Sequence, residues 1–298
     1  MNHTITRIAP TPSGFLHAGN VFSFLLTRYL SKKNNAHLIL RIDDIDKSRY
    51  RKEYVEDIFE TLHFFEIYYQ EGPLNVIDFE ENYSQQLRIP QYFETINKLK
   101  NLGLLYACTC SRTDIQAHRE VGRCKNNCRE SIIPFDTANA SWKIKLPPEC
   151  IISFTDERLG KVSVNLNAVM GDFVVLRKDG LPSYQIASLC DDAAMQVNYI
   201  VRGEDLLPST AAQLFLAKHL SFDLFSKSTF FHHPLMKDQS GNKMAKSNGS
   251  FSISDMRKRK LSKKEILSLI KNFFENIIND SSKSQFFSKL VLEEIFDC

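Results

Sequence analysis

The fold is decided by residues 6–46, which read TRIAPTPSGFLHAGNVFSFLLTRYLSKKNNAHLILRIDDID. Residues 6–9 are typical of a short strand, and a turn rich in proline, serine and glycine follows them. Between residues 17 and 31, apolar side chains recur at helical spacing, at Val21, Phe22, Leu25, Leu26 and Leu30. Residues 36–42 form a second apolar strand that ends in acidic residues. A strand–helix–strand opening predicts an α/β fold with a parallel, doubly wound sheet.

The pattern changes after Gly103, where short alternating segments such as residues 142–146 and 162–166 replace the longer elements. We interpret residues 104–170 as an inserted domain with its own β-rich core. The sequence further predicts strands over 173–177, 198–202 and 229–232, and helices over 54–65, 85–102, 208–220 and 258–296. The expected domains are 1–103 (first half of the Rossmann-type domain), 104–170 (insertion), 171–240 (second half) and 241–298 (a lysine loop and a helical C-terminal region).

The bulk composition is that of a globular protein, with 298 residues, 43% hydrophobic and 24% charged. The apolar runs are too short to cross a bilayer, and residues 1–10 lack the apolar core of a secretory signal. We therefore expect a soluble, cytoplasmic protein that does not bind membranes, and we expect a monomer.

The formal net charge is only +3, but the basic residues are unevenly distributed. Between Lys243 and Lys264 there are eight of them against a single acid, Asp255. Such a local excess attracts phosphates or nucleic acid, and a solvated helix face is an equally good interpretation of charge alone. The eight are Lys243, Lys246, Arg257, Lys258, Arg259, Lys260, Lys263 and Lys264.

Two short motifs suit the phosphates of a nucleotide. His17 and Gly19 stand at the start of the first helix, where free backbone N–H groups and the helix dipole favour an anion. Lys243 and Lys246 flank a small residue in a glycine-bounded loop and could stabilise the negative charge of a leaving pyrophosphate. Each motif alone is more often a structural turn or a solvated basic loop.

Together with three further stretches, these motifs resemble class I glutamyl-tRNA synthetases over about residues 5–250. His17 to Asn20 is similar to the family's variant of the "HIGH" signature, and residues 243–247 are similar to its "KMSKS" loop, with Ala245 in place of the first serine. All five motifs occur in order along the chain, at residues 7–20, 40–46, 177–184, 200–206 and 243–247.

The resemblance implies roles in ATP binding and catalysis. The implied catalytic residues are His17, Lys243 and Lys246, and the ATP-binding residues are His17, Gly19, Asn20 and Lys246. The implied partners are ATP with Mg²⁺, L-glutamate and tRNA.

The same resemblance implies the glutamate-binding residues Arg7, Thr11, Asp43, Tyr184 and Arg202. An arginine fork suits the side-chain carboxylate of glutamate, and a carboxylate suits its α-ammonium group. Asp43 stands where the family usually has glutamate, and Thr11 stands where it usually has serine.

Four cysteines cluster in the insertion as Cys108-x-Cys110 and, thirteen residues later, Cys124-x₃-Cys128. Two close pairs favour tetrahedral zinc over disulfides in a protein without a secretory signal, and unpaired reduced thiols are the alternative. Bacterial members of the family often have a Cys-x-Cys zinc site here, so the resemblance also implies structural Zn²⁺. His118 is a spare candidate ligand.

Only 51 residues follow Ser247, whereas an anticodon-reading body needs on the order of 100 or more. We expect that body to be absent. This layout resembles a truncated branch of the family, the glutamyl-queuosine tRNA(Asp) synthetases, which attach glutamate to queuosine in the anticodon loop. The alternatives are a truncated ligase that charges a tRNA 3′ end and a non-catalytic RNA-binding paralogue. The presence of His17, Gly19, Lys243 and Lys246 argues against the paralogue.

Overall fold

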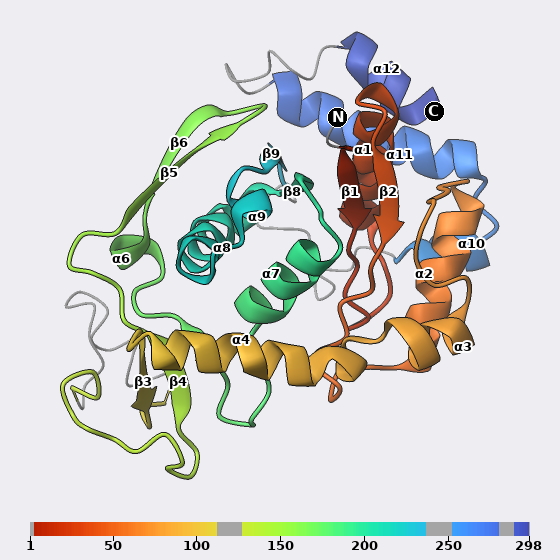
Figure 1. Ribbon diagram of the computed structural model, residues 1–298. Helices are drawn as coiled ribbons and strands as arrows, with labels where there is room; N and C mark the ends of the chain where they lie inside the picture. The colour runs from red at the N-terminus through yellow and green to blue at the C-terminus, as the bar shows by residue number, and fades with distance from the viewer. Residues whose placement is uncertain (1–2, 112–126, 237–251, 280–288, 298) are drawn as a thin grey trace. The chain divides into compact units, whose positions relative to one another are not determined.

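The computed structural model describes residues 3–111, 127–236, 252–279 and 289–297, and the chain divides into two compact units. Unit 1 contains Met1–Ser84, Tyr199–Asp205 and Phe230–Cys298, and unit 2 contains Gln85–Asn198 and Leu206–Thr229. Figure 1 shows the course of the chain. No helix in the described part of the chain is both long enough and apolar enough to span a membrane.

Unit 1 begins with the predicted strand–helix–strand motif. Strands β1 (Ile5–Ile8) and β2 (His37–Leu40) pair in parallel, and helix α1 (Ala18–Lys33) connects them. Strand β8 (Tyr199–Gly203) lies against β1 although almost 200 residues separate them in the chain. The parallel pair with its helical crossover confirms the predicted α/β class.

The core of unit 1 forms around α1. All five apolar positions predicted for its buried face, Val21, Phe22, Leu25, Leu26 and Leu30, are at most 2% exposed. Helix α2 (Lys52–Phe64) adds Val55, Ile58 and Leu62 to the same core. Because these side chains recur every three or four residues, one face of each helix is removed from water. This packing holds the N-terminal end of α1 in place.

Unit 2 combines helices with two antiparallel sheet elements. Strands β3 (Leu105–Cys108), β4 (Ser141–Ile144) and β7 (Val174–Leu176) form one sheet. Strands β5 (Ile151–Asp156) and β6 (Gly160–Asn165) form a hairpin. The predicted β-rich character of the stretch after residue 103 is thereby confirmed, while the predicted domain boundaries stay predictions.

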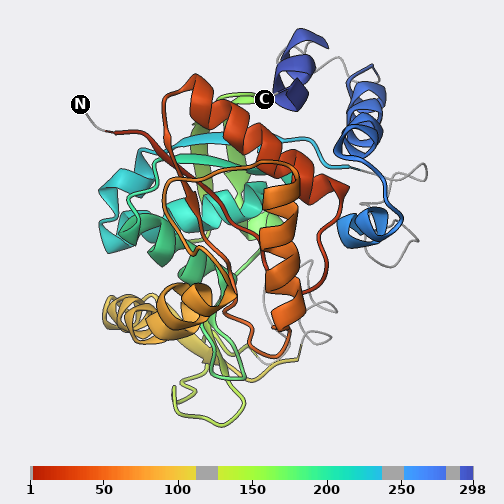
Figure 2. The ribbon, with the colours of Figure 1, turned by 90° about the vertical axis from the view of Figure 1, so that its right-hand side faces the viewer.

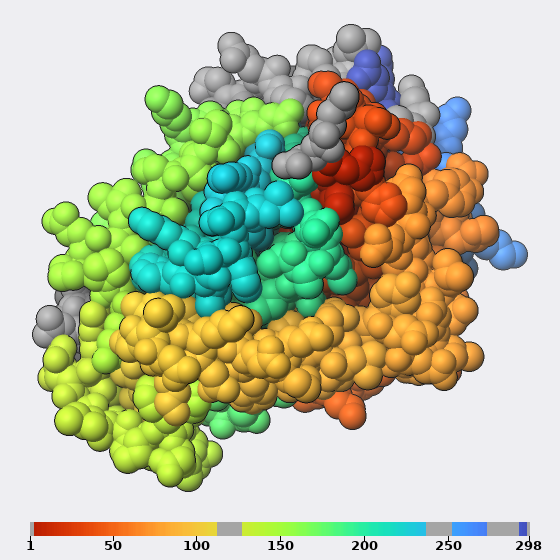
Figure 3. All heavy atoms as spheres, in the orientation of Figure 1, coloured from red at the N-terminus to blue at the C-terminus, as the bar shows by residue number. Residues whose placement is uncertain are grey.

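Three helices complete the core of unit 2: α4 (Ile89–Asn101), α7 (Tyr184–Ala194) and α8 (Leu207–Leu220). One side of α4 is buried against α7 and α8, while its other side is exposed on the face shown in Figure 3. The helix predicted over 85–102 was too long at its start. Gln85–Arg88 is a 3₁₀ turn, and Pro90, which has no N–H to donate, stands in the first turn of α4.

The C-terminal region of unit 1 is helical, as predicted, but interrupted. Helix α10 (Ile253–Lys258) ends before α11 (Lys263–Asn279), and α12 (Lys289–Asp297) follows. Lys260 adopts a left-handed conformation (φ 62°), and Ser262 forms reciprocal hydrogen bonds with Glu265 at the start of α11.

The other short elements are α3 (Val76–Asp78), a π-helical turn (Phe79–Tyr83), α6 (Leu166–Val169), a 3₁₀ turn (Glu204–Leu206), α9 (Asp223–Ser226) and β9 (Thr229–His233).

Candidate active site

The turn between β1 and α1 is the first part of the site. His17 is the N-cap of α1 and adopts an extended backbone conformation, and its backbone N–H donates to Asn20 Oδ1 at 3.0 Å. The first turn of α1 contains no acidic residue. Its N–H groups and the positive end of the helix dipole therefore meet no competing carboxylate from that turn, which is the environment that a phosphate requires.

Gly19 leaves room for the His17 ring. A Cβ atom at position 19 would lie 3.1 and 3.2 Å from two atoms of the imidazole and 3.6 Å from Met236 Sδ. A side chain here would push the His17 ring away from its present position. Met236, which is 7% exposed, thus also borders the start of α1, and no pattern in the sequence pointed to it because it lies far along the chain from Gly19.

Two of the residues predicted to bind glutamate lie on the adjacent strands β1 and β8. Arg7 and Arg202 are each 4% exposed. Arg7 Nη1 donates to the carbonyl oxygen of Val201 at 3.3 Å, and the Arg202 guanidinium lies 5.6 Å from the centre of the Phe230 ring. A Cβ at Gly203, beside Arg202, would come within 2.6 Å of Asp205 Oδ1, so the Asp205 side chain would have to move. Two buried guanidinium groups on neighbouring strands can recognise an anion.

Asp43, which the resemblance places in the glutamate-binding site, is paired with an arginine of the protein itself. Arg41, which is 2% exposed, donates through Nε to Asp43 Oδ1 at 2.6 Å and through Nη2 to Oδ2 at 3.0 Å. The pair is a bidentate fork inside the protein. The resemblance assigns Asp43 to the α-ammonium group of glutamate. Its assigned role stays a prediction.

The two remaining glutamate-binding candidates differ in position. Thr11 is exposed in the turn after β1, within unit 1. Tyr184 belongs to unit 2, where it is the first residue of α7 and is 36% exposed. Their contacts with glutamate also stay predictions.

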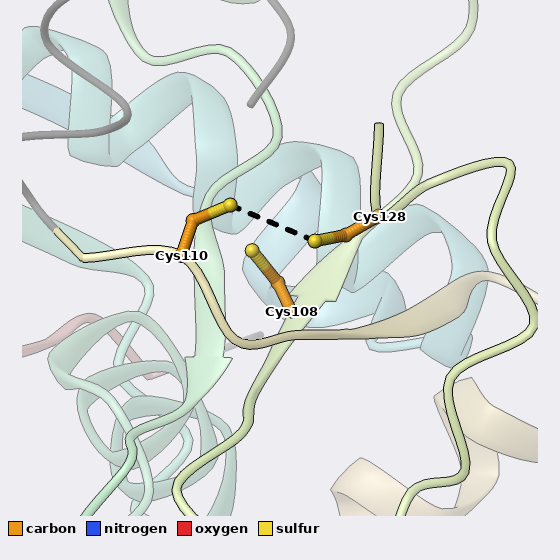
Figure 4. Close-up of side chains that lie close together, drawn as sticks. All are labelled: Cys108, Cys110 and Cys128. Atoms are coloured by element: carbon orange, nitrogen blue, oxygen red, sulfur yellow. Dashed lines mark hydrogen bonds between the residues drawn. The ribbon is translucent and has the colours of Figure 1, made fainter. Parts of the chain in front are cut away.

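Three of the four clustered cysteines come together in unit 2, as Figure 4 shows. Cys108, Cys110 and Cys128 are buried, and their sulfur atoms lie within 4.8 Å of one another. The Cys110 and Cys128 sulfurs are 3.6 Å apart, too far for a disulfide at about 2.05 Å. A tetrahedral zinc with Zn–S bonds of about 2.3 Å separates its sulfur ligands by about 3.8 Å, so this group fits such an ion. Cys124 and His118 lie outside the described residues.

With this geometry established, the chain can be compared with known proteins. The family model for the catalytic domain of class I tRNA synthetases (E and Q) matches residues 3–298. The chain belongs to this family. It is 36% identical over 247 residues to the Glutamyl-Q tRNA(Asp) synthetase of Pseudomonas putida (strain W619), an alignment that covers 82% of this chain and 77% of the relative.

Glutamate–tRNA ligases match the chain as well. That of Aquifex aeolicus is 31% identical over 271 residues, covering 86% of this chain, and the chain spans about half (54%) of the ligase's length. A crystal structure of the glutamate–tRNA synthetase from Elizabethkingia anophelis aligns with a TM-score of 0.70 at 22% identity, covering 99% of this chain and 65% of that one. The likeness to that structure supports the class I α/β fold.

Two residues of the basic run between Lys243 and Lys264 form ion pairs with acids of unit 1. Lys243 and Lys246 lie outside the described residues. Arg257, one of the basic residues of this run, forms ion pairs with Asp57 at 2.6 Å and Glu60 at 3.0 Å. Lys263, in the same run, pairs with an exposed acid on another part of unit 1, Glu66. These ion pairs engage the Arg257 guanidinium within unit 1, and the interpretation of the run as a phosphate-binding face stays a prediction.

Proposed function

We propose that this synthetase activates L-glutamate with ATP to glutamyl-adenylate and transfers the glutamyl group to queuosine in the anticodon loop of tRNA(Asp). The observation that carries this proposal is the 36% identity to Glutamyl-Q tRNA(Asp) synthetases over 77% of the relative's length. The second candidate is a ligase that charges a tRNA 3′ end, which the 31% identity to glutamate–tRNA ligases favours.

The activation step needs a site for the ATP phosphates. An oxygen of the glutamate α-carboxylate attacks the α-phosphorus of Mg²⁺–ATP, a P–O bond forms, and the bond to pyrophosphate breaks. Negative charge accumulates on the departing pyrophosphate. We assign the N–H groups at the start of α1, with His17 and Asn20, to the phosphates, because that turn has no acidic residue. Lys243 and Lys246 are the cations proposed to neutralise the leaving group.

Recognition of glutamate is assigned to the buried arginines. Arg7 and Arg202 supply positive charge in a site largely removed from water, where a charge-assisted hydrogen bond to the side-chain carboxylate is strong. Asp43 is proposed to accept from the α-ammonium group while Arg41 holds its carboxylate in one orientation. Thr11 and Tyr184 complete the proposed contacts. In the transfer step, a hydroxyl group of queuosine attacks the glutamyl carbonyl carbon, an ester forms, and AMP leaves.

We further propose that the buried thiols of Cys108, Cys110 and Cys128, with Cys124, hold a structural Zn²⁺. Support comes from the sulfur spacing, since three buried thiols within 4.8 Å match the donor set of such a site. Binding of the ion would contribute to the folding free energy of this part of unit 2.

The test begins with exchange of labelled pyrophosphate into ATP in the presence of glutamate and without tRNA. Members of the queuosine branch activate glutamate without tRNA, so exchange is expected. Labelled glutamate is then offered with tRNA(Asp) carrying queuosine, the same tRNA carrying guanosine, and tRNA(Glu). Label is expected only on the first. Label on the terminal adenosine of tRNA(Glu) would replace the proposal with the conventional ligase. If no pyrophosphate exchange occurred, either without tRNA or with each of the three tRNAs, the proposed activation of glutamate would be refuted.

A further inference from the structure

The backbone of Leu16, the residue that precedes His17, is held from both sides. The backbone N–H of Leu16 donates to Asp57 Oδ2 at 2.8 Å, and its carbonyl oxygen accepts from the backbone N–H of Ile253 at 2.8 Å. Leu16 is 3% exposed and Ile253 is fully buried. Thus α2 and α10, which are far apart in sequence, hold the two peptide groups on either side of the Leu16 Cα, and Figure 2 shows these helices in orange and blue.

Asp57 also binds the same α10 through its second oxygen. Oδ1 accepts from Arg257 Nη2 at 2.6 Å, while Arg257 Nη1 contacts Glu60 Oε2 at 3.0 Å. The Asp57 side chain is 2% exposed and that of Arg257 is 16% exposed, whereas Glu60 is 64% exposed. Asp57 therefore joins Leu16 to Arg257 in a buried network, and Glu60 is a solvated partner at its edge.

A buried carboxylate is costly unless its partners compensate for lost hydration. Burial raises the pKa of Asp57, and the Leu16 N–H and the Arg257 guanidinium oppose that rise. An alanine or a larger apolar residue at position 57 would avoid the cost but would leave the Leu16 N–H and Arg257 without this acceptor. The carboxylate has one oxygen for each partner, which fixes the spacing between them.

The network bears directly on the start of α1. Leu16 is followed by His17, the N-cap of α1, so a shift of the Leu16 backbone also shifts the first N–H groups of the helix. A misplacement of about 1 Å in a positioning contact can cost about 100-fold in rate. Side chains nearby add to the restraint, because Phe15 packs edge-on against Tyr54 on α2 at 5.1 Å.

We propose that Asp57 and Arg257 are positioning residues for the ATP site, holding the backbone of Leu16 and thereby the N-terminal end of α1 in the geometry that binds the nucleotide phosphates. This role rests on the proposed use of that helix end for ATP. It is a role for residues outside the five motifs by which the chain resembles its family.

The experiment compares Asp57→Asn and Arg257→Lys with the matched control Glu60→Gln, which alters the exposed partner of the same arginine. Pyrophosphate exchange is measured at varied ATP and at varied glutamate. We expect kcat/KM for ATP to fall by about 10- to 100-fold in Asp57→Asn with a raised KM for ATP, while KM for glutamate stays within about 2-fold. Arg257→Lys should have a smaller defect of the same kind, and Glu60→Gln should match the wild type. A substitution that only destabilised the fold would lower the active fraction and therefore kcat, with KM for ATP unchanged.

Backbone hydrogen exchange provides a readout that does not depend on activity. Peptides that cover residues 13–22 should exchange faster in Asp57→Asn than in Glu60→Gln, at equal urea midpoints. An unchanged KM for ATP in Asp57→Asn, together with an unchanged rate of backbone hydrogen exchange over residues 13–22, would overturn the positioning role. If the wild type itself showed no pyrophosphate exchange, the proposed function would fail, and the hydrogen exchange comparison alone would decide whether Asp57 holds this turn.

Discussion

Replacing Asp191 with alanine should strongly destabilise unit 2. Asp191, on α7, is 1% exposed and accepts four hydrogen bonds. Two come from Arg88 at 2.8 and 2.9 Å, one from the Tyr92 hydroxyl at 2.7 Å and one from Gln85 Nε2 at 2.8 Å. Burial alone would lower the pKa of Arg88, but the hydrogen bond and the charge of Asp191 raise it above its ordinary value. The carboxylate therefore compensates for a largely buried cation.

The magnitude follows from what the substitution leaves behind. Asp191→Ala leaves the Arg88 guanidinium, with a side chain only 16% exposed, without its counter-ion, and it leaves the buried Tyr92 hydroxyl without its acceptor. Removal of one partner of a buried ion pair costs about 3–5 kcal/mol. The matched control is Asp179→Ala, which breaks the Arg177–Asp179 pair, whose side chains are 36% and 47% exposed. An exposed pair contributes about 0–1 kcal/mol, so the control should differ little from the wild type.

The single tryptophan makes the assay specific for this unit. Trp142 lies on β4, within unit 2, so its fluorescence during urea unfolding reports the unit that contains Asp191. With a urea dependence of about 2 kcal/mol per molar, the midpoint should fall by roughly 2 M in Asp191→Ala and hardly at all in Asp179→Ala. A loss of less than about 1 kcal/mol in Asp191→Ala, or equal losses in both variants, would refute the reasoning.

Four further outcomes are expected. Cys108→Ser combined with Cys128→Ser should lower zinc, measured by elemental analysis, from one ion per chain to none, and a metal-free wild type purified without chelator would contradict the site. Lys246→Ala should slow pyrophosphate exchange by about 100-fold or more with little change in glutamate binding, and a rate within a few-fold of wild type would exclude this lysine from the mechanism. Arg202→Ala should raise KM for glutamate by about 10-fold or more while KM for ATP is retained, and equal changes in both would contradict its assignment to glutamate. Burial raises the pKa of the Cys190 thiol to about 12, so iodoacetamide at pH 8 should label it only after unfolding, and rapid labelling of Cys190 itself in the native protein would contradict that burial.

Local patterns in the sequence were sufficient for most of the elements in unit 1. The apolar side chains of α1 recur with helical spacing, and the strands on either side of it are short apolar runs, so the strand–helix–strand opening could be predicted without knowledge of the rest of the chain. Predictions were less accurate at element ends. The start of α4 depends on Pro90, and the break before α11 depends on the left-handed Lys260 and the Ser262–Glu265 cap, which are details of single residues.

By itself, the sequence determined which chemical groups this protein can use: the two motifs proposed to bind phosphates, the two buried arginines, and the clustered cysteines. Only the tertiary structure decided how several charged groups are paired. The Asp43 carboxylate is held by Arg41, and Arg257 is bound to an acid 200 residues away, Asp57. Identity and charge are properties of a residue and can be read along the chain. The partner of a buried charge depends on which helices and strands pack together, because burial removes water and leaves only nearby groups to replace it.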